Sequence, residues 1–255
     1  MHMSMRVKTL RRLFFPPKCA ACGELLEAFR DASPRALCKN CLVKWDQAKN
    51  RPCQCCGLPV MDCTESPAMP KRHGIDTLIR LARYVPDKKY EIANRVIFKL
   101  KDKDSIELQE YLAAELVPMI EKQLRMLGQT PENTVFVWAP RSVQAERRVG
   151  HDQSKRLCYA LCRAFGKEKP LCMLRRTGGR VQKRLGQTER RKNAFSAFEA
   201  VDKNCVQLKG KCVVLVDDVV TTGATLSACS AKLKPYGPAV VIAACIAVDT
   251  PQNHT

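Results

Sequence analysis

The sequence predicts an α/β fold, a mostly parallel sheet with flanking helices, preceded by a small cysteine-rich module. After residue 75, short apolar runs alternate with helical patterns, as expected for parallel strands joined by helical crossovers. Eight of the 15 cysteines lie between Cys19 and Cys63, where sustained hydrophobic periodicity is absent. We therefore expect two parts: residues 1–75 form the cysteine-rich module, and residues 76–255 form the α/β domain.

The predicted elements of the second part follow from their apolar spacing. Buried strands are expected at 78–84, 134–140, 211–216 and 239–248, because each is a short and nearly continuous apolar run. Helices are expected at 90–100, 106–127, 152–165 and 224–233. The basic stretch 175–192 carries little apolar material and several glycines, which predicts a mobile loop.

Charge and composition restrict the partners. The chain has 44 Lys and Arg against 25 Asp and Glu, a formal net charge of +19. Such a field attracts polyanions, above all nucleic acid, although it is also compatible with a basic surface that only maintains solubility. No apolar run reaches 18 residues and no signal peptide is recognisable, so we expect no membrane span and a cytoplasmic location. In that reducing compartment, the cysteines indicate metal or free thiols rather than disulfides.

The segment Val213–Leu226 is the most informative in the chain. Four apolar residues predict a strand buried on both faces, and Asp217 and Asp218 follow at its carboxyl end, where open α/β sheets bind ligands. The turn that follows into a helix consists of small and hydroxyl-bearing residues, namely Thr221, Thr222, Gly223, Ala224 and Thr225. Backbone N–H groups at a helix start, with these hydroxyls, favour a phosphate.

A sugar phosphate satisfies both halves of this segment. The two carboxylates can accept hydrogen bonds from vicinal ribose hydroxyls, while the turn holds a 5′-phosphate. Mg²⁺ on a pyrophosphate would offset the repulsion between acids and ligand. The pattern resembles the signature by which type I phosphoribosyltransferases bind 5-phosphoribosyl-1-pyrophosphate (PRPP). A Walker B carboxylate is disfavoured because the chain contains no P-loop motif. The remaining alternative is a threonine-rich helix N-cap next to surface acids that have no function.

Two cysteine clusters indicate metal. Cys19, Cys22, Cys38 and Cys41 form two C-x-x-C pairs separated by 15 residues, a spacing typical of a structural tetrathiolate Zn²⁺ site. A thioredoxin-like redox pair is the weaker alternative. The second cluster, Cys53, Cys56 and Cys63, offers three ligands for an uncertain second zinc, and Cys55 or His73 could supply the fourth because Ser66 stands at the expected position.

Taken together, these segments resemble the ComF family, which is associated with natural competence and DNA uptake in bacteria. The resemblance extends from Leu13–Cys19 through the paired cysteines to the acidic loop, and Gly150 and Gln153 match a family signature from which Val149, His151 and Asp152 depart. It implies a type I phosphoribosyltransferase-like domain behind a zinc finger. Further matches lie in a basic segment with Arg175, Arg176, Thr177, Gln182, Leu185 and Arg191.

The resemblance also assigns the remaining candidate residues. Arg141 and Ser142 follow a strand where type I transferases hold pyrophosphate, so both are expected to contact PRPP. The basic segment could close over PRPP as a lid, lie along a nucleic-acid backbone or be a solvated tether. Its candidate residues are Arg175, Arg176, Lys183, Arg184, Arg190 and Arg191.

Three functions remain open from the sequence. The first is a PRPP-binding protein of DNA uptake that contacts single-stranded DNA and the uptake machinery. The second is an active Mg²⁺-dependent phosphoribosyltransferase acting on an unknown nitrogen acceptor in nucleotide metabolism. In the third, the zinc module is purely a protein-docking surface.

Overall fold

The computed structural model describes residues 16–26, 36–54, 56–64, 74–86, 88–102, 105–177 and 195–249. Several predicted positions lie outside these described residues: Cys55, His73, Lys183, Arg184, Arg190 and Arg191.

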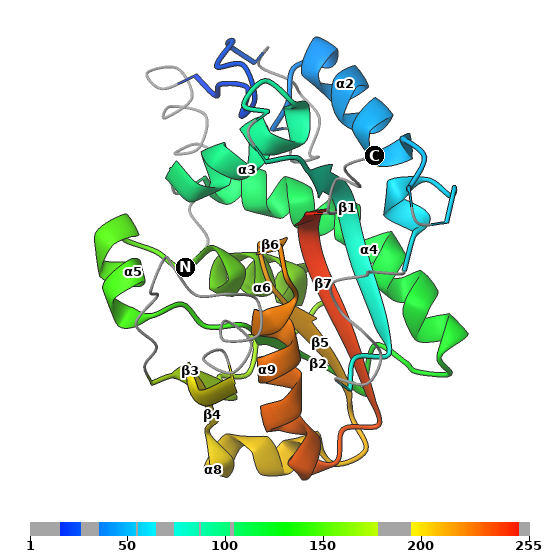
Figure 1. Cartoon of the computed structure of the whole chain (residues 1–255), viewed down its shortest axis with the longest axis vertical. Coiled ribbons are helices and arrows are strands. Elements are labelled where there is room, and N and C mark those ends of the chain that lie inside the picture. Colours follow the sequence, from blue (N-terminus) through cyan, green and yellow to red (C-terminus); the bar gives the residue numbers. More distant parts are fainter. Residues whose placement is uncertain are drawn as a thin grey trace.

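A parallel sheet forms the centre of the molecule (Figure 1). Its strands are β1 (Thr77–Tyr84), β2 (Thr134–Trp138), β5 (Cys212–Val216) and β7 (Val240–Asp249), in the order β1-β7-β5-β2. Every neighbouring pair is parallel, and the short β6 (Val219–Val220) adds to β7. The predicted α/β class with a mostly parallel sheet is therefore confirmed.

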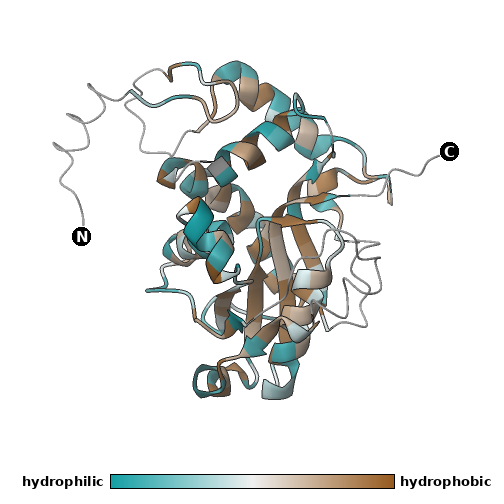
Figure 2. Ribbon diagram, turned by 60° about the vertical axis from the view of Figure 1, so that its left-hand side comes forward, coloured by the Kyte–Doolittle hydropathy of each residue, from teal (hydrophilic) through white to brown (hydrophobic). Residues whose placement is uncertain are grey.

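Helices cover both faces of this sheet. On one face lie α3 (Ile92–Asp102), α4 (Ile106–Met126) and α6 (Gln153–Ala164), and on the other lies α9 (Ala224–Leu233). Helix α4 buries leucines and an isoleucine four residues apart, from Leu108 to Leu124, so one apolar stripe faces the strands. All five residues of β5 are buried, which explains the continuous apolar run there. Figure 2 shows the apolar strands enclosed between more polar helices.

The stretch predicted as a mobile loop begins with regular structure, so that prediction was wrong for its first residues. Strand β3 (Leu174–Arg176) pairs antiparallel with β4 (Phe198–Ala200). The Arg175 guanidinium donates to Glu199 at 2.7 and 3.0 Å, and Arg176 lies 5.3 Å from the centre of the Phe198 ring. Leu174 and Phe198 are buried against the α9 side of the sheet, which anchors this hairpin despite its basic sequence. Helix α8 (Asp202–Cys205) and the 3-10 turn η3 (Val206–Leu208) follow.

The cysteine-rich part contains a helix that the sequence did not predict. Helix α2 (Lys39–Asn50) buries Cys41, Trp45, Ala48 and Lys49, a helical spacing obscured by the polar residues between them. Its contact with the rest of the molecule is partly ionic, because Lys49 Nζ donates to Glu115 of α4 and lies 2.9 Å from Asp46. Trp45 Nε1 also donates to Glu115, at 3.4 Å. This network attaches the helix that carries Cys41 to the helix layer of the sheet.

The second cysteine cluster lies where the cysteine-rich part contacts the edge of the sheet. The 3-10 turn η1 (Val60–Asp62) lies between Cys56 and Cys63 and packs on the edge strand β1. Outside the two clusters, the described cysteines are buried with one exception, Cys172, which is exposed. None of the described helices is both long and apolar enough to cross a bilayer.

Candidate functional site

The acidic pair is held by its backbone at the carboxyl end of β5. Asp217 donates its N–H to Ala244 O at 3.0 Å, and Asp218 O accepts from Ile246 N at 3.0 Å. The register against β7 continues without a slip, from Val216 opposite Ala244 to Val219 opposite Ala247. The two carboxylates therefore extend from a backbone that is hydrogen-bonded to β7 at both residues.

Asp217 contacts helix α6. Its carboxylate accepts from Ser154 Oγ and from the Asp218 N–H, both at 2.9 Å. Burial, reinforced by the neighbouring charge of Asp218, raises the pKa of Asp217 to about 8. Two carboxylates this close cannot both be charged at low cost, so Asp217 carries a proton over much of the neutral range.

Asp218 makes the ionic contact of the pair, although it is as buried as Asp217. One of its oxygens accepts from the Val219 N–H at 2.8 Å, and the other accepts from Arg141 Nη2 at 3.1 Å. The Arg141 side chain is 24% exposed and that of Asp218 is 10% exposed, so this ion pair is only partly screened by solvent. The structure thus brings together Asp218 and Arg141, which are 77 residues apart and were assigned to the same ligand.

The loop that carries Arg141 is positioned by a residue that sequence analysis did not assign to the site. Asp152 Oδ2 accepts from the Arg141 N–H at 3.0 Å, while its Oδ1 caps α6 by accepting from Lys155 N at 3.1 Å. Burial raises the pKa of Asp152. Asp152 directly before the periodic stretch of α6 is an ordinary N-cap signal, which could have identified it. Ser154, the partner of Asp217, had no such signal.

Ser142 serves a local structural purpose. Its hydroxyl accepts from Ala145 N at 3.2 Å and caps the short helix α5 (Val143–Val149), an element missing from the sequence prediction. None of the residues of α5 is buried, so no apolar stripe announced it. The backbone of Ser142 still lies beside Arg141 at the mouth of the site.

The threonine- and glycine-rich turn leads into α9 as predicted. Gly223 adopts a left-handed conformation with φ of 69°, which a side chain would disfavour, and α9 begins at the next residue. Thr222 Oγ1 accepts from Ala224 N at 3.4 Å, while Thr221 is exposed. The hydroxyls of this turn and the first N–H groups of α9 therefore follow the acidic pair beyond the carboxyl end of β5.

The first cysteine cluster fits a zinc ion. The sulfur atoms of Cys19, Cys22, Cys38 and Cys41 all lie within 4.8 Å of one another, and those of Cys22 and Cys38 are 3.7 Å apart. Tetrahedral Zn²⁺ with bonds of about 2.3 Å places its sulfurs about 3.8 Å apart. The sulfurs of Cys53, Cys56 and Cys63 meet the same 4.8 Å limit, so the second cluster supplies three converging thiols.

Comparisons with known proteins match two separate segments of the chain. Residues 154–254 match the phosphoribosyl transferase domain family, and residues 10–71 match the double zinc ribbon domain family. A search of curated proteins found no match. One similar solved structure is the crystal structure of TT1426 from Thermus thermophilus, with 18% identity, a TM-score of 0.31, and coverage of 58% of this chain and 85% of that one. The two family matches show that the chain carries a phosphoribosyl transferase domain behind an N-terminal double zinc ribbon.

Replacing one thiol of the first cluster tests the zinc assignment. We expect Cys22→Ser to lower the zinc content of the purified chain by one ion, because a tetrathiolate site that loses a ligand binds zinc far more weakly. Metal analysis measures this directly. Cys172→Ser is the matched control, since Cys172 is an exposed cysteine outside both clusters and its loss should leave the zinc content unchanged. Equal zinc in the wild type and Cys22→Ser would contradict the assignment.

The raised pKa of Asp217 predicts a pH-dependent stability. The folded state holds a proton that the unfolded state releases above its ordinary pKa of 3.8, so stability is lost as the pH rises toward about 8. We expect Asp217→Asn to melt at least ~2 °C above the wild type at pH 8 and to lose this part of the pH dependence. Thermal unfolding at pH 6 and pH 8 measures both. If the substitution raises the melting temperature no more at pH 8 than at pH 6, Asp217 is ionised in the folded protein and the prediction fails.

Proposed function

We propose that this chain binds PRPP together with Mg²⁺ at the acidic loop. The observation that carries the proposal is the meeting of three groups at the carboxyl end of the sheet. These are the Asp217–Asp218 pair, the hydroxyl-lined start of α9, and Arg141 from the neighbouring loop. In type I phosphoribosyltransferases the same segment holds the ribose and its 5′-phosphate.

The ion pair between Arg141 and Asp218 suggests how the site receives its ligand. Without ligand each group neutralises the other at 3.1 Å. Ribose hydroxyls can donate to Asp218, while a pyrophosphate oxygen accepts from Arg141, so the ligand replaces one ion pair with two sets of contacts. Mg²⁺, when bound with the pyrophosphate, would offset the charge of the ligand beside these acids.

The same arrangement supports phosphoribosyl transfer as the alternative activity. Breaking the bond to pyrophosphate leaves positive charge on the ribose ring and negative charge on the leaving group. Arg141 and Mg²⁺ would stabilise the departing pyrophosphate, and an unknown nitrogen acceptor would then attack the anomeric carbon. Release of pyrophosphate from PRPP in the presence of candidate acceptors distinguishes transfer from binding alone.

We further propose that the protein is ComF-like and acts in DNA uptake, where it contacts single-stranded DNA and proteins of the uptake machinery. The net charge of +19 supports contact with a polyanion. Among the described residues, Arg147 and Arg148 are exposed in the last turn of α5, the helix that follows Arg141. We also propose a cytoplasmic location and retain the division into residues 1–75 and 76–255.

Calorimetry with Mg²⁺ and PRPP tests the binding proposal. We expect Asp218→Asn to weaken PRPP binding about tenfold or more, because a charged acceptor for the ribose hydroxyls becomes neutral. Asp202→Asn is the matched control, since Asp202 lies on α8 and accepts from Tyr236 rather than facing the site. PRPP binding that is absent in the wild type, or unchanged by Asp218→Asn, would overturn the proposal.

Salt dependence tests contact with DNA. Affinity for an oligothymidylate should fall steeply between about 50 and 200 mM salt, with a slope on a logarithmic plot of about −0.7 per phosphate contacted. The Arg147→Ala/Arg148→Ala double variant should bind more weakly and with a shallower slope. Arg163→Ala, which removes an exposed arginine paired with Glu110, should behave like the wild type. An affinity insensitive to salt would refute the contact.

A further inference from the structure

A buried arginine lies beside the second cysteine cluster. Arg80 is on the edge strand β1, is 1% exposed, and stands opposite Cys245 of β7 in the sheet register. Its guanidinium Nη2 donates to the sulfur of Cys63, one of the three clustered cysteines. A side chain of the α/β sheet therefore contacts a sulfur of the zinc ribbon directly.

Burying a guanidinium is costly unless a negative group lies against it. A neutral thiol is a weak acceptor, but a thiol bound to zinc is deprotonated and carries charge. Zn²⁺ with three thiolates has a net charge of −1, and the positive charge of Arg80 brings the assembly to zero. The loaded cluster is thus the form that suits the buried arginine.

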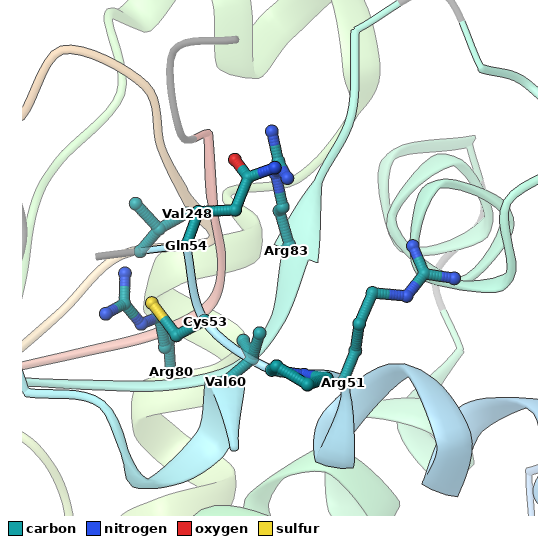
Figure 3. Close-up of a pocket in the computed structure, with 8 residues that line it drawn as sticks. Arg51, Cys53, Gln54, Val60, Arg80, Arg83 and Val248 are labelled. Carbon is teal, nitrogen blue, oxygen red and sulfur yellow. The ribbon is translucent and has the colours of Figure 1, made fainter. Parts of the chain in front are cut away.

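A second arginine near the cluster has a different ionic partner. A small cavity, partly open to solvent, lies beside the cluster and is lined by Arg51, Cys53, Gln54, Val60, Arg80 and Arg83, among others. In Figure 3 the Arg80 side chain lies beside Cys53, whereas Arg51 extends away from the cavity. Arg51 is instead ion-paired with Glu91 at 3.5 Å. Arg51 and Arg80 thus border one cavity, and only Arg80 of this pair reaches toward the cluster.

We propose that Arg80 is an outer-shell partner of a zinc ion held by Cys53, Cys56 and Cys63. Its guanidinium stabilises the Cys63 thiolate, orients it toward the metal and ties metal loading to the packing of the ribbon on β1. The linkage is reciprocal: Arg80 raises zinc affinity at this cluster, and zinc stabilises the fold around Arg80. The site of PRPP binding plays no part in this proposal.

Zinc competition on the full chain tests whether Arg80 raises the zinc affinity of the second cluster. With a chromogenic chelator, we expect Arg80→Met to weaken the binding of one zinc ion about 10- to 100-fold while the other zinc is held as before. Arg80→Lys, which keeps the charge, should recover part of this loss. Arg51→Met is the matched control and should retain both ions with wild-type affinity.

Cys56→Ser identifies the affected ion. In that background the second cluster lacks a ligand, so adding Arg80→Met should leave the affinity of the remaining zinc unchanged. The proposal is refuted if Arg80→Met holds both ions as tightly as the wild type, or if it weakens the zinc that survives in Cys56→Ser.

A double-mutant cycle tests whether Cys63 and Arg80 stabilise the fold together, and it does not require a zinc measurement. Cys63→Ser should lower the melting temperature more when Arg80 is present than in an Arg80→Met background, because only in the first case is a buried guanidinium left without the thiolate. Additive losses would mean that the two side chains act independently, which would overturn the linkage.

Discussion

The constraint on which the site depends is the burial of two adjacent carboxylates at the end of one strand. The backbone of each is hydrogen-bonded to β7, so neither can withdraw from the other. The fold accommodates them by giving them different partners: Ser154 and a proton for Asp217, and the Arg141 guanidinium for Asp218. Asp152 then holds the Arg141 backbone in place, which makes the loop after β2 part of the same unit. A ligand that binds as proposed would meet an acid already paired with an arginine.

The cysteine clusters, beside α4 and the edge strand β1, meet a different constraint. A ribbon of this size is too small to form a stable core of its own, and the buried residues in its described part include four cysteines. Metal can replace that core, while Trp45, Lys49 and Arg80 connect the ribbon to the domain beneath it. Each of these contacts places a polar or charged atom at the seam, so the two parts are joined by specific pairs as well as by apolar packing.

Sequence patterns predicted the elements that are governed by continuous burial or by regular apolar spacing. The strands around Val214 and Ala243 and the helix around Leu116 are of this kind, and so is the helix that begins at Ala224. Helix α5 has no buried face and α2 buries a lysine, so neither shows the usual stripe. At the site, the acidic loop was recognisable from local order alone. The contacts of Asp218 with Arg141 and of Asp217 with Ser154 join distant segments, and no local pattern encodes such pairings.

The unbroken register of β5, the acidic pair and β6 along β7 limits how this segment can change. Substituting either acid changes one side chain but leaves the backbone register in place. Inserting or deleting one residue between Val216 and Val219 would instead exchange the faces of all following side chains, so that Val220 would leave the core on the α9 side. This loop should therefore tolerate substitutions better than insertions or deletions. Chemical variation at the site should arise by replacement of side chains, with loop length held constant.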